Sequence, residues 1–257
     1  ITTKVYDKVG RLYRVINGDI NSTNYTEFEY FDNGSRKTVK YISGQVEEYT
    51  YHADGQLNTL VNKDKNGVEF DRYTYTYDSA NNQISKYEII NGVEKGTTTN
   101  VYDSLNRLEK VTEPIGRVTS YTFDKAGNRK TQTVVFGGVS EVITYNYNAN
   151  NQLTFSQKVI GAKIVEAQSY VFDFNGNVVK TTTSDYSTVV TKTTEVVNEY
   201  DTLNQLIKTT TIGKVILNAY NAEGLRIEKS VDGKLTRYLY EDQQVVLEVD
   251  SDNAQIA

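Results

Sequence analysis

Few side chains in this sequence could take part in catalysis, and the only histidine is His52. A serine or cysteine nucleophile usually needs a histidine base beside it, so the chain offers one such base, and it has no cysteine. The segment His52-Ala53-Asp54-Gly55 stands where similar segments begin with Asp. Turn positions favour short polar side chains, so we interpret His52 as a substituted turn residue. A multi-histidine metal site cannot form from one copy of the chain.

Acidic and amide side chains between Asn62 and Gly67 resemble the opening of a calcium-binding loop. The twelfth position of that loop, however, is Tyr73, where a bidentate Glu would be needed. We therefore favour a hairpin tip, because Asn-Gly is the preferred two-residue turn. Paired carboxylates could serve a glycosidase, but acids that recur at every turn are explained by the turn itself. The sequence thus predicts no catalytic residue, no cofactor and no metal site.

Arginines follow the turn segments at similar offsets. They are Arg11, Arg36, Arg107, Arg129 and Arg226. We expect each guanidinium to pair with the Asp that begins the next turn segment along the sheet. An exposed ion pair of this kind contributes about 0–1 kcal/mol to the stability of the fold. A row of anion-binding sites is the alternative. Three glycosylation sequons begin at Asn21, Asn24 and Asn33, and they matter only in a eukaryotic secretory context.

All these residues belong to one recurring unit, in which an aromatic residue precedes a polar one every 20 to 28 residues. The anchors are Tyr6-Asp7, Phe31-Asp32, Tyr51-His52, Tyr77-Asp78, Tyr102-Asp103, Phe123-Asp124, Tyr147-Asn148, Phe172-Asp173, Tyr200-Asp201, Tyr220-Asn221 and, in degenerate form, Tyr240-Glu241. Self-similarity at this period is typical of arrays whose neighbouring units complete one another's packing.

Each unit contains two turn signals. After the anchor, as in Asp124-Lys125-Ala126-Gly127, a polar first residue and a Gly or Asn in fourth place predict a type I turn closed by a left-handed residue and a bulge. A second aromatic residue often lies two positions before the anchor, which indicates a strand with both rings on one face. Midway between anchors, other dipeptides predict two-residue hairpins. These are Asn17-Gly18, Asn66-Gly67, Asn91-Gly92, Gly137-Gly138, Gly161, Gly213 and Asp232-Gly233.

The predicted fold class is all-β: antiparallel β-hairpin repeats stacked into a continuous sheet of roughly twenty short strands, with almost no helix. With 38% hydrophobic residues and a mean hydropathy of −0.55, the chain lacks the aliphatic residues for a thick two-layer sandwich. It has 21 tyrosines instead. Each ring can remove about 150–250 Å² from water, so rows of tyrosine can hold such a sheet together.

Three runs resemble the YD repeats of Rhs proteins, bacterial wall-associated proteins, the B and C components of insecticidal toxin complexes, and teneurins. They are Tyr6-Asp7-Lys8-Val9-Gly10-Arg11-Leu12, Phe123-Asp124-Lys125-Ala126-Gly127-Asn128-Arg129 and Glu113-Pro114-Ile115-Gly116-Arg117. The resemblance spans essentially the whole chain. It implies a curved or spiralling β-sheet that forms part of a hollow shell, often around a C-terminal toxin. The Asp-Pro-x-Gly-Leu-like segment at which some members cut themselves has no match, because the only proline, Pro114, belongs to a repeat turn.

We predict a single array over residues 1–257, of about ten to eleven units, with no linker inside it. The chain has no methionine, which indicates a fragment of a longer protein. No apolar run reaches membrane-spanning length, so no membrane span is expected in this fragment. The net charge of −5 comes from 28 basic and 33 acidic residues that are interspersed, which argues against nucleic acid as a partner.

These observations favour a non-catalytic structural segment over an enzyme. We expect it to scaffold, display or encapsulate a toxin or effector region outside this fragment, so its partner is the remainder of its own polypeptide, including a C-terminal toxin cargo. The alternative is a cell-surface carbohydrate-binding or adhesion module that uses exposed Tyr rows. We prefer packing of those rings within the sheet, because they lie at strand-register positions beside hydrophobic partners. The expected location is secreted or cell-surface, in a bacterium.

Overall fold

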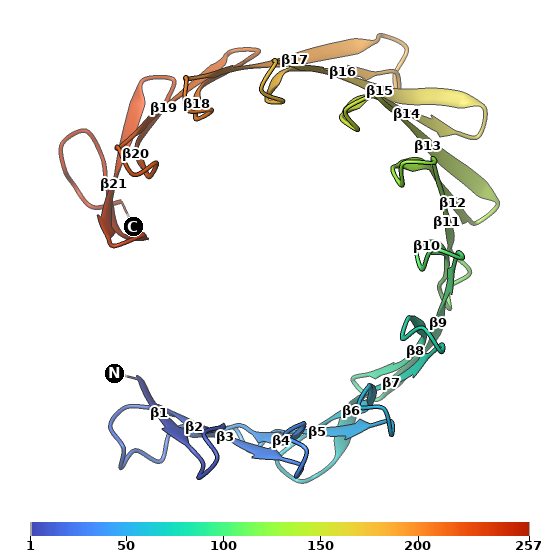
Figure 1. The fold of residues 1–257 in the computed structure, drawn as a ribbon, viewed down its shortest axis with the longest axis vertical. Helices are drawn as coiled ribbons and strands as arrows, with labels where there is room; N and C mark the ends of the chain where they lie inside the picture. The colour runs from blue at the N-terminus through green and yellow to red at the C-terminus, as the bar shows by residue number, and fades with distance from the viewer. Residues whose placement is uncertain (1, 257) are drawn as a thin grey trace. The chain divides into compact units, whose positions relative to one another are not determined.

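The computed structural model describes residues 2–256, and in this range the chain forms 22 strands and no helix. The strands follow one another along the ribbon of Figure 1. Their bounds are β1 Thr2–Tyr6, β2 Leu12–Asn17, β3 Tyr25–Tyr30, β4 Arg36–Lys40, β5 Val46–Tyr51, β6 Leu57–Lys63, β7 Glu69–Tyr77, β8 Gln83–Ile90, β9 Val93–Tyr102, β10 Leu108–Thr112, β11 Val118–Phe123, β12 Arg129–Phe136, β13 Val139–Tyr147, β14 Leu153–Ile160, β15 Lys163–Phe172, β16 Val178–Asp185, β17 Lys192–Tyr200, β18 Leu206–Thr211, β19 Lys214–Tyr220, β20 Arg226–Val231, β21 Lys234–Glu241 and β22 Gln244–Val249.

The chain divides into two compact parts, Ile1–Ser120 and Tyr121–Ala257, each of which contains several repeat units. In the first part, β1 to β10 and residues 118–120 of β11 pair in chain order, each antiparallel to the next. In the second, β12 to β22 do the same. The prediction of an all-β chain of antiparallel hairpin repeats is confirmed. That residues 1–257 form one array stays a prediction.

One five-residue turn follows the anchor in almost every unit, and we call it the YD turn. In the first, the amide of Asp7 donates to the carbonyl of Arg11 at 2.8 Å, and the amide of Gly10 donates to the carbonyl of Asp7 at 3.1 Å. The fourth residue is left-handed, with φ of 83° at Gly10 and 58° at Asn106. The strand register shifts between Val5 and Tyr6, which is the predicted bulge. The turns begin at Asp7, Phe31, His52, Asp78, Asp103, Asp124, Asn148, Asp173, Asp201 and Asn221.

Two anchors differ from the prediction. The amide of Phe31 donates to the carbonyl of Ser35, so Tyr30 is the anchor and Phe31 occupies the place of Asp, because the turn must put Gly34 in fourth position. At the last anchor, Glu241 pairs with Gln244, so β21 and β22 are joined by a two-residue turn. A YD turn was wrongly expected after Tyr240, where no Gly or Asn stands four places later to close it.

The strand ends away from the YD turns are joined by two types of turn, and we call this side of the sheet the second turn side. Two-residue turns join Ile90 to Val93 and Phe136 to Val139, for example, as predicted. The predicted two-residue turn at Asn66-Gly67 is wrong, since these residues close a five-residue turn of the YD type. Asn17-Gly18 opens a longer connection that ends at Tyr25. The five-residue turns on the second turn side begin at Tyr41, Asp64, Glu113 and Asp250. The run from Glu113 to Arg117 is therefore not an anchor turn.

Very little of the chain is buried. Within residues 2–256, the buried hydrophobic residues are Ile16, Val39, Val61 and Val249. The accessible surface is 16562 Å², against about 11,400 Å² expected for a compact globular chain of 29.1 kDa. Each of the two compact parts is therefore a single layer of sheet, and its stability must come from contacts between adjacent hairpins.

Candidate functional site

The polar residue that begins a YD turn holds the turn together. Oδ1 of Asp103 accepts hydrogen bonds from the amides of Leu105 at 2.9 Å and Arg107 at 3.0 Å, while Oδ2 accepts from Nε of Arg107 at 2.7 Å. The side-chain hydrogen bond from Arg107, followed by its backbone hydrogen bond, lowers the pKa of Asp103. Oδ1 of Asn148 receives the equivalent amide bonds, so the acceptor at this position does not have to be charged. The turns that begin at Phe31 and His52 form without a side-chain oxygen in first place.

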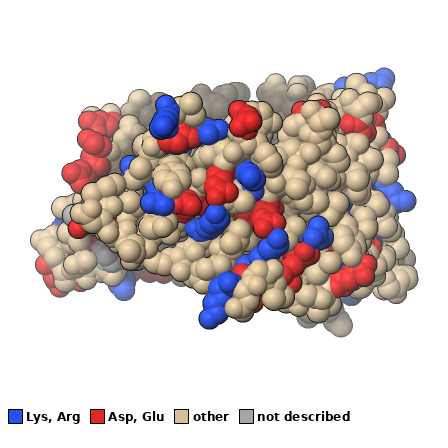
Figure 2. Space-filling model, turned by 90° about the horizontal axis from the view of Figure 1, so that it is seen from below, with Lys and Arg blue, Asp and Glu red and all other residues tan. Residues whose placement is uncertain are grey.

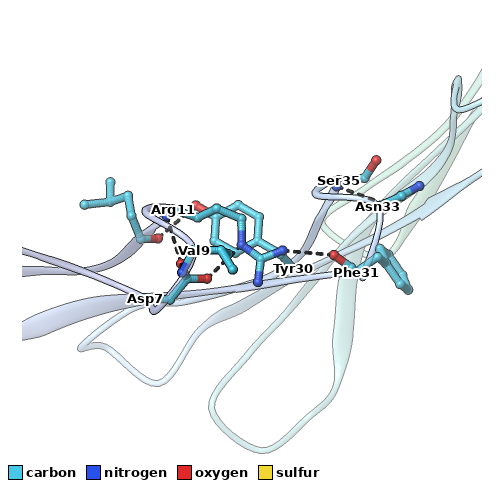
Figure 3. Close-up of polar contacts among 8 residues, drawn as sticks. Asp7, Val9, Arg11, Tyr30, Phe31, Asn33 and Ser35 are labelled. Atoms are coloured by element: carbon cyan, nitrogen blue, oxygen red, sulfur yellow. Dashed lines mark hydrogen bonds and ion pairs between the residues drawn. The ribbon is translucent and has the colours of Figure 1, made fainter.

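Two of the five arginines pair with an acid, but within their own turn. Arg11 meets Asp7 and Arg107 meets Asp103, each at 2.7 Å. The expected pairing with the next unit's Asp is wrong, because the fifth turn residue lies directly beside the first. Arg11 reaches the next YD turn in another way: Nη1 donates to the carbonyl of Phe31 at 3.1 Å, as Figure 3 shows.

The other three arginines stand one residue later, at the start of the returning strand. The guanidinium of Arg36 lies over the rings of Phe28 and Tyr49, at 5.5 and 5.8 Å from their centroids. Arg129 and Arg226 lie over Tyr121 and Tyr238 at 4.8 and 4.9 Å. The guanidinium groups therefore contact turn residues or aromatic rings, and the row of anion-binding sites stays a prediction.

The anchor tyrosine connects one unit to the unit before it. In five units its hydroxyl donates to the backbone carbonyl of the first strand residue after the preceding YD turn. The bonds are Tyr30 to Leu12 at 2.8 Å, Tyr102 to Gln83 at 3.0 Å, Tyr200 to Val178 at 3.4 Å, Tyr220 to Leu206 at 3.0 Å and Tyr240 to Arg226 at 3.0 Å. Tyrosine thus supplies both a packed ring and a polar tip at this position.

A second link between repeat units comes from the fifth residue of the YD turn, and it is not among the predictions from the sequence. An Asn side chain at this position donates to the left-handed Asn of the next YD turn. The bonds are Asn82 to Asn106 at 3.0 Å, Asn128 to Asn151 at 2.9 Å and Asn177 to Asn204 at 3.0 Å. The recurring Asn five places after the anchor was the available signal.

The remaining candidates for chemistry are engaged in turns. Nε2 of His52 lies 3.2 Å from the carbonyl of Tyr75, and its ring meets Tyr77 edge-on. Its amide and carbonyl make the YD-turn bonds, which confirms it as a turn residue. Oδ1 of Asp64 accepts from the amides of Asn66 and Val68, both at 2.8 Å, which fits the hairpin tip. No group of three or more His, Cys, Asp or Glu able to hold a metal is found in residues 2–256.

The sequon asparagines occupy exposed connections. Asn21 and Asn24 lie in the segment between β2 and β3, and Asn33 is the third residue of a YD turn.

Some charged side chains on the strands form ion pairs with a neighbouring strand. Lys63 meets Glu48 and Lys208 meets Glu199, both at 2.7 Å. Figure 2 shows basic and acidic side chains interspersed over the visible face, with no large area of one sign. In residues 2–256, no helix has the length and hydropathy to span a membrane.

The fold and these contacts define a class of protein: a β-hairpin repeat protein whose anchor tyrosine and turn residues join consecutive units. Residues 102–140 match the family model described as the RHS repeat. The chain belongs to this Rhs (YD-repeat) family, and the resemblance drawn from its motifs is confirmed.

Bacterial relatives share the sequence over most of this chain. It is 32% identical over 235 residues to the tRNA nuclease WapA of Bacillus subtilis (strain 168), which covers 91% of this chain and 9% of the relative. The tRNA(Glu)-specific nuclease WapA of Bacillus subtilis subsp. natto matches with the same identity and coverage. The chain thus spans about a tenth of the length of these relatives.

Solved structures of a toxin complex are also similar. The crystal structure of TcdB2-TccC3 matches with a TM-score of 0.48 and 14% identity, over 99% of this chain and 17% of that one. A structure of the Photorhabdus luminescens Tc holotoxin pore matches with a TM-score of 0.47 and 14% identity, over 99% of this chain and 16% of that one.

Proposed function

We propose that this chain is a non-catalytic structural segment of an Rhs/YD β-shell. In this proposal it scaffolds, displays or encapsulates a toxin or effector region that lies outside residues 1–257. The observation that carries the proposal is the use of the recurring side chains: the anchor hydroxyl and the fifth-position amide are both directed at the adjacent unit. Side chains that bond to the adjacent repeat in this way support a structural role and not a catalytic one.

The relatives support this division of labour. They are named as tRNA nucleases, and the matched region is about a tenth of their length. We infer that a nuclease or other toxic activity, where the longer protein has one, lies in a different segment. We also infer a secreted or cell-surface location in a bacterium, since the relatives are bacterial.

The aromatic rows support a scaffold more than they support a row of sugar-stacking platforms. Tyr102 and Tyr220 give their hydroxyl groups to backbone carbonyls of the preceding unit, and Tyr51 packs edge-on against Phe31 at 6.1 Å. Rings held in this way serve the sheet itself.

Limited proteolysis of the full-length protein tests the proposal. We expect the effector segment to resist protease in the intact protein and to become sensitive when Tyr102→Ala and Tyr220→Ala open two junctions of the array. Purified residues 1–257 should leave tRNA intact. Cleavage of tRNA by this segment alone, or equal sensitivity of the effector before and after the array is opened, would overturn the proposal.

A further inference from the structure

Two consecutive YD turns depart from the motif in their first residue. Eight of the ten begin with Asp or Asn, whereas these two begin with Phe31 and His52. The ring of Phe31 cannot accept the amide bonds that a carboxylate accepts in first place. Nε2 of His52 lies 3.2 Å from the carbonyl of Tyr75, in the next repeat unit. Departures from a local structural rule are expected at functional sites, so these two turns are candidates for a role beyond the fold.

In both turns, the third residue supplies the side-chain acceptor instead. Oδ1 of Asn33 accepts from the amide of Ser35 at 3.0 Å, and Oδ1 of Asp54 accepts from the amide of Gln56 at 3.2 Å. In other turns the first residue accepts this fifth-place amide, as at Arg107. The first residue is therefore not needed as an acceptor here, and its ring is available for another contact.

A surface cavity of about 640 Å³ lies between the same two turns. Its lining includes the rings of Phe31, Tyr51 and His52. The rings of Phe31 and Tyr51 are 6.1 Å apart and inclined at 88°, so both can turn a face toward one ligand. Phe31 is 37% exposed, which leaves its ring accessible from solvent. The volume lies in the range of about 300–1,000 Å³ that is usual for ligand pockets.

The charge of the lining is negative. Asp32 borders the cavity, is exposed, and lies in second place of its turn, where its carboxylate makes none of the bonds that close the turn. Among residues 2–256, no Lys or Arg lines the cavity. Lys37 lies over the Phe31 ring at 6.0 Å without bordering the cavity, and Figure 3 shows this ring directed away from Arg11. A carboxylate beside accessible ring faces favours a cation.

A quaternary ammonium group fits this combination of walls. Its charge is spread over apolar methyl groups, which pack against ring faces, whereas a primary ammonium is strongly hydrated. We propose that the cavity binds a small trimethylammonium compound of the choline type, with Phe31 and Tyr51 as ring walls and Asp32 as the counter-charge. The proposal goes beyond the scaffold role, and its failure would leave that role untouched.

Saturation-transfer NMR titration of the purified chain tests the site, with choline as the probe. Two comparison ligands separate charge from shape. The first, 3,3-dimethyl-1-butanol, has the shape of choline without its charge, and the second, ethanolamine, has a charge without the methyl groups. We expect saturable binding of choline, and binding of the other two that is about 5-fold weaker or absent, since each lacks one part of the cation–π contact.

Two variants remove one wall each. Phe31→Asn deletes the ring and supplies a residue that begins two other YD turns, at Asn148 and Asn221, so the turn should persist. It should weaken choline binding by about 5-fold, the effect of one cation–π contact. Asp32→Asn deletes the exposed carboxylate without touching the bonds of the turn, and should weaken choline binding by about 2- to 5-fold.

The matched control is Phe174→Ala. Phe174 is a fully exposed ring in another YD turn and does not line this cavity, so the variant should bind choline like the wild type. Lys37→Gln removes the cation that lies over the Phe31 ring, and should bind choline at least as tightly as the wild type.

Three results would overturn the proposal. One is equal binding of choline and 3,3-dimethyl-1-butanol, and another is unchanged choline affinity in both Phe31→Asn and Asp32→Asn. The third is co-sedimentation of the chain with phosphatidylcholine vesicles when free choline does not bind, which would assign the rings to a membrane surface.

Discussion

Two residues of the YD motif have separate physical tasks. The polar residue closes its own turn, because its side-chain oxygen accepts two amide bonds that the turn would otherwise leave to water. The tyrosine closes the gap to the preceding unit, because its hydroxyl reaches a backbone carbonyl there. One residue therefore acts within a hairpin and the other acts between hairpins.

Removing the hydroxyl of one anchor tests the second task. Tyr102→Phe keeps the ring and deletes the 3.0 Å bond to the Gln83 carbonyl. We expect the free energy of unfolding to fall by about 1 kcal/mol, the usual net value of one such bond. Urea titration followed by circular dichroism measures it. Tyr6→Phe is the control: its side chain is 56% exposed and its hydroxyl has no partner within residues 2–256, so no change is expected. Equal losses in both variants would contradict the role given to the hydroxyl.

The turn acids make the stability depend on pH. Side-chain and then backbone hydrogen bonds from Asn82 lower the pKa of Asp78, and the side-chain bond from Asn177 lowers the pKa of Asp173. A carboxyl whose pKa is lower in the folded state stabilises the fold above its unfolded pKa of about 3.9 and loses that contribution as the pH falls further. We expect Asp78→Asn and Asp173→Asn to keep the turn, as Asn148 does, and to lose less stability than the wild type between pH 5 and pH 3.

The reverse change provides the control for this pH dependence. Asn148→Asp should steepen the acid loss of stability in thermal unfolding measured across the same pH range. An unchanged acid slope in all three variants would show that these turns do not contribute to it.

Residue types indicated most of these roles, but not the partners. Asp or Asn in first place with Gly or Asn in fourth predicted eight of the ten YD turns, since those residues tolerate the geometry that the turn requires. The turns that begin at Phe31 and His52 carried only the fourth-place Gly as a signal. The bonds from Tyr102 to Gln83 and from Asn82 to Asn106 join residues about 20 apart in sequence, and their distances depend on strand register. No local pattern specifies such a partner.

The same five-residue turn occurs at both ends of the strands, after the anchors and on the second turn side. The motif predicted this turn only after the aromatic anchors, so the prediction of a two-residue turn at Asn66-Gly67 was wrong. Asn-Gly fits both types, since each places Gly in the left-handed region; Asp64, two residues before Asn66, decides between them because its carboxylate accepts the amides of Asn66 and Val68. Element type was predictable, while the choice of turn required the flanking acid.

Substitution of two glycines on the second turn side can distinguish backbone strain from steric contact. Gly44 and Gly67 have φ of 85° and 80°, so alanine at either position should cost about 1–2 kcal/mol. A Cβ at Gly44 would also lie 2.7 Å from Cβ of Lys65 in the neighbouring hairpin, whereas a Cβ at Gly67 would meet nothing within 4 Å. We expect Gly44→Ala to destabilise the chain more than Gly67→Ala in urea titration. Equal costs would mean that the neighbouring turn moves aside freely.

At the scale of the whole chain, stability should depend on neighbouring hairpins. Few residues are buried, and the described links join one unit to the next, as in other repeat proteins. The period of the aromatic anchors predicted this organisation. What the repeats enclose or display was not predictable from these residues, because it depends on sequence outside them.

A double-mutant cycle tests whether the coupling is confined to neighbours. Asn128→Ala removes the donor of the bond to Asn151, and Asn151→Gly removes its acceptor while keeping a residue that adopts φ of 59° readily. We expect these two changes to couple by about 0.5 kcal/mol or more, since they share one bond. The control cycle combines Asn128→Ala with Asn204→Gly, which belongs to another link of the same kind, and should be additive within about 0.3–0.5 kcal/mol. Coupling of similar size in both cycles would show that the array responds as one cooperative body and not as a chain of nearest-neighbour contacts.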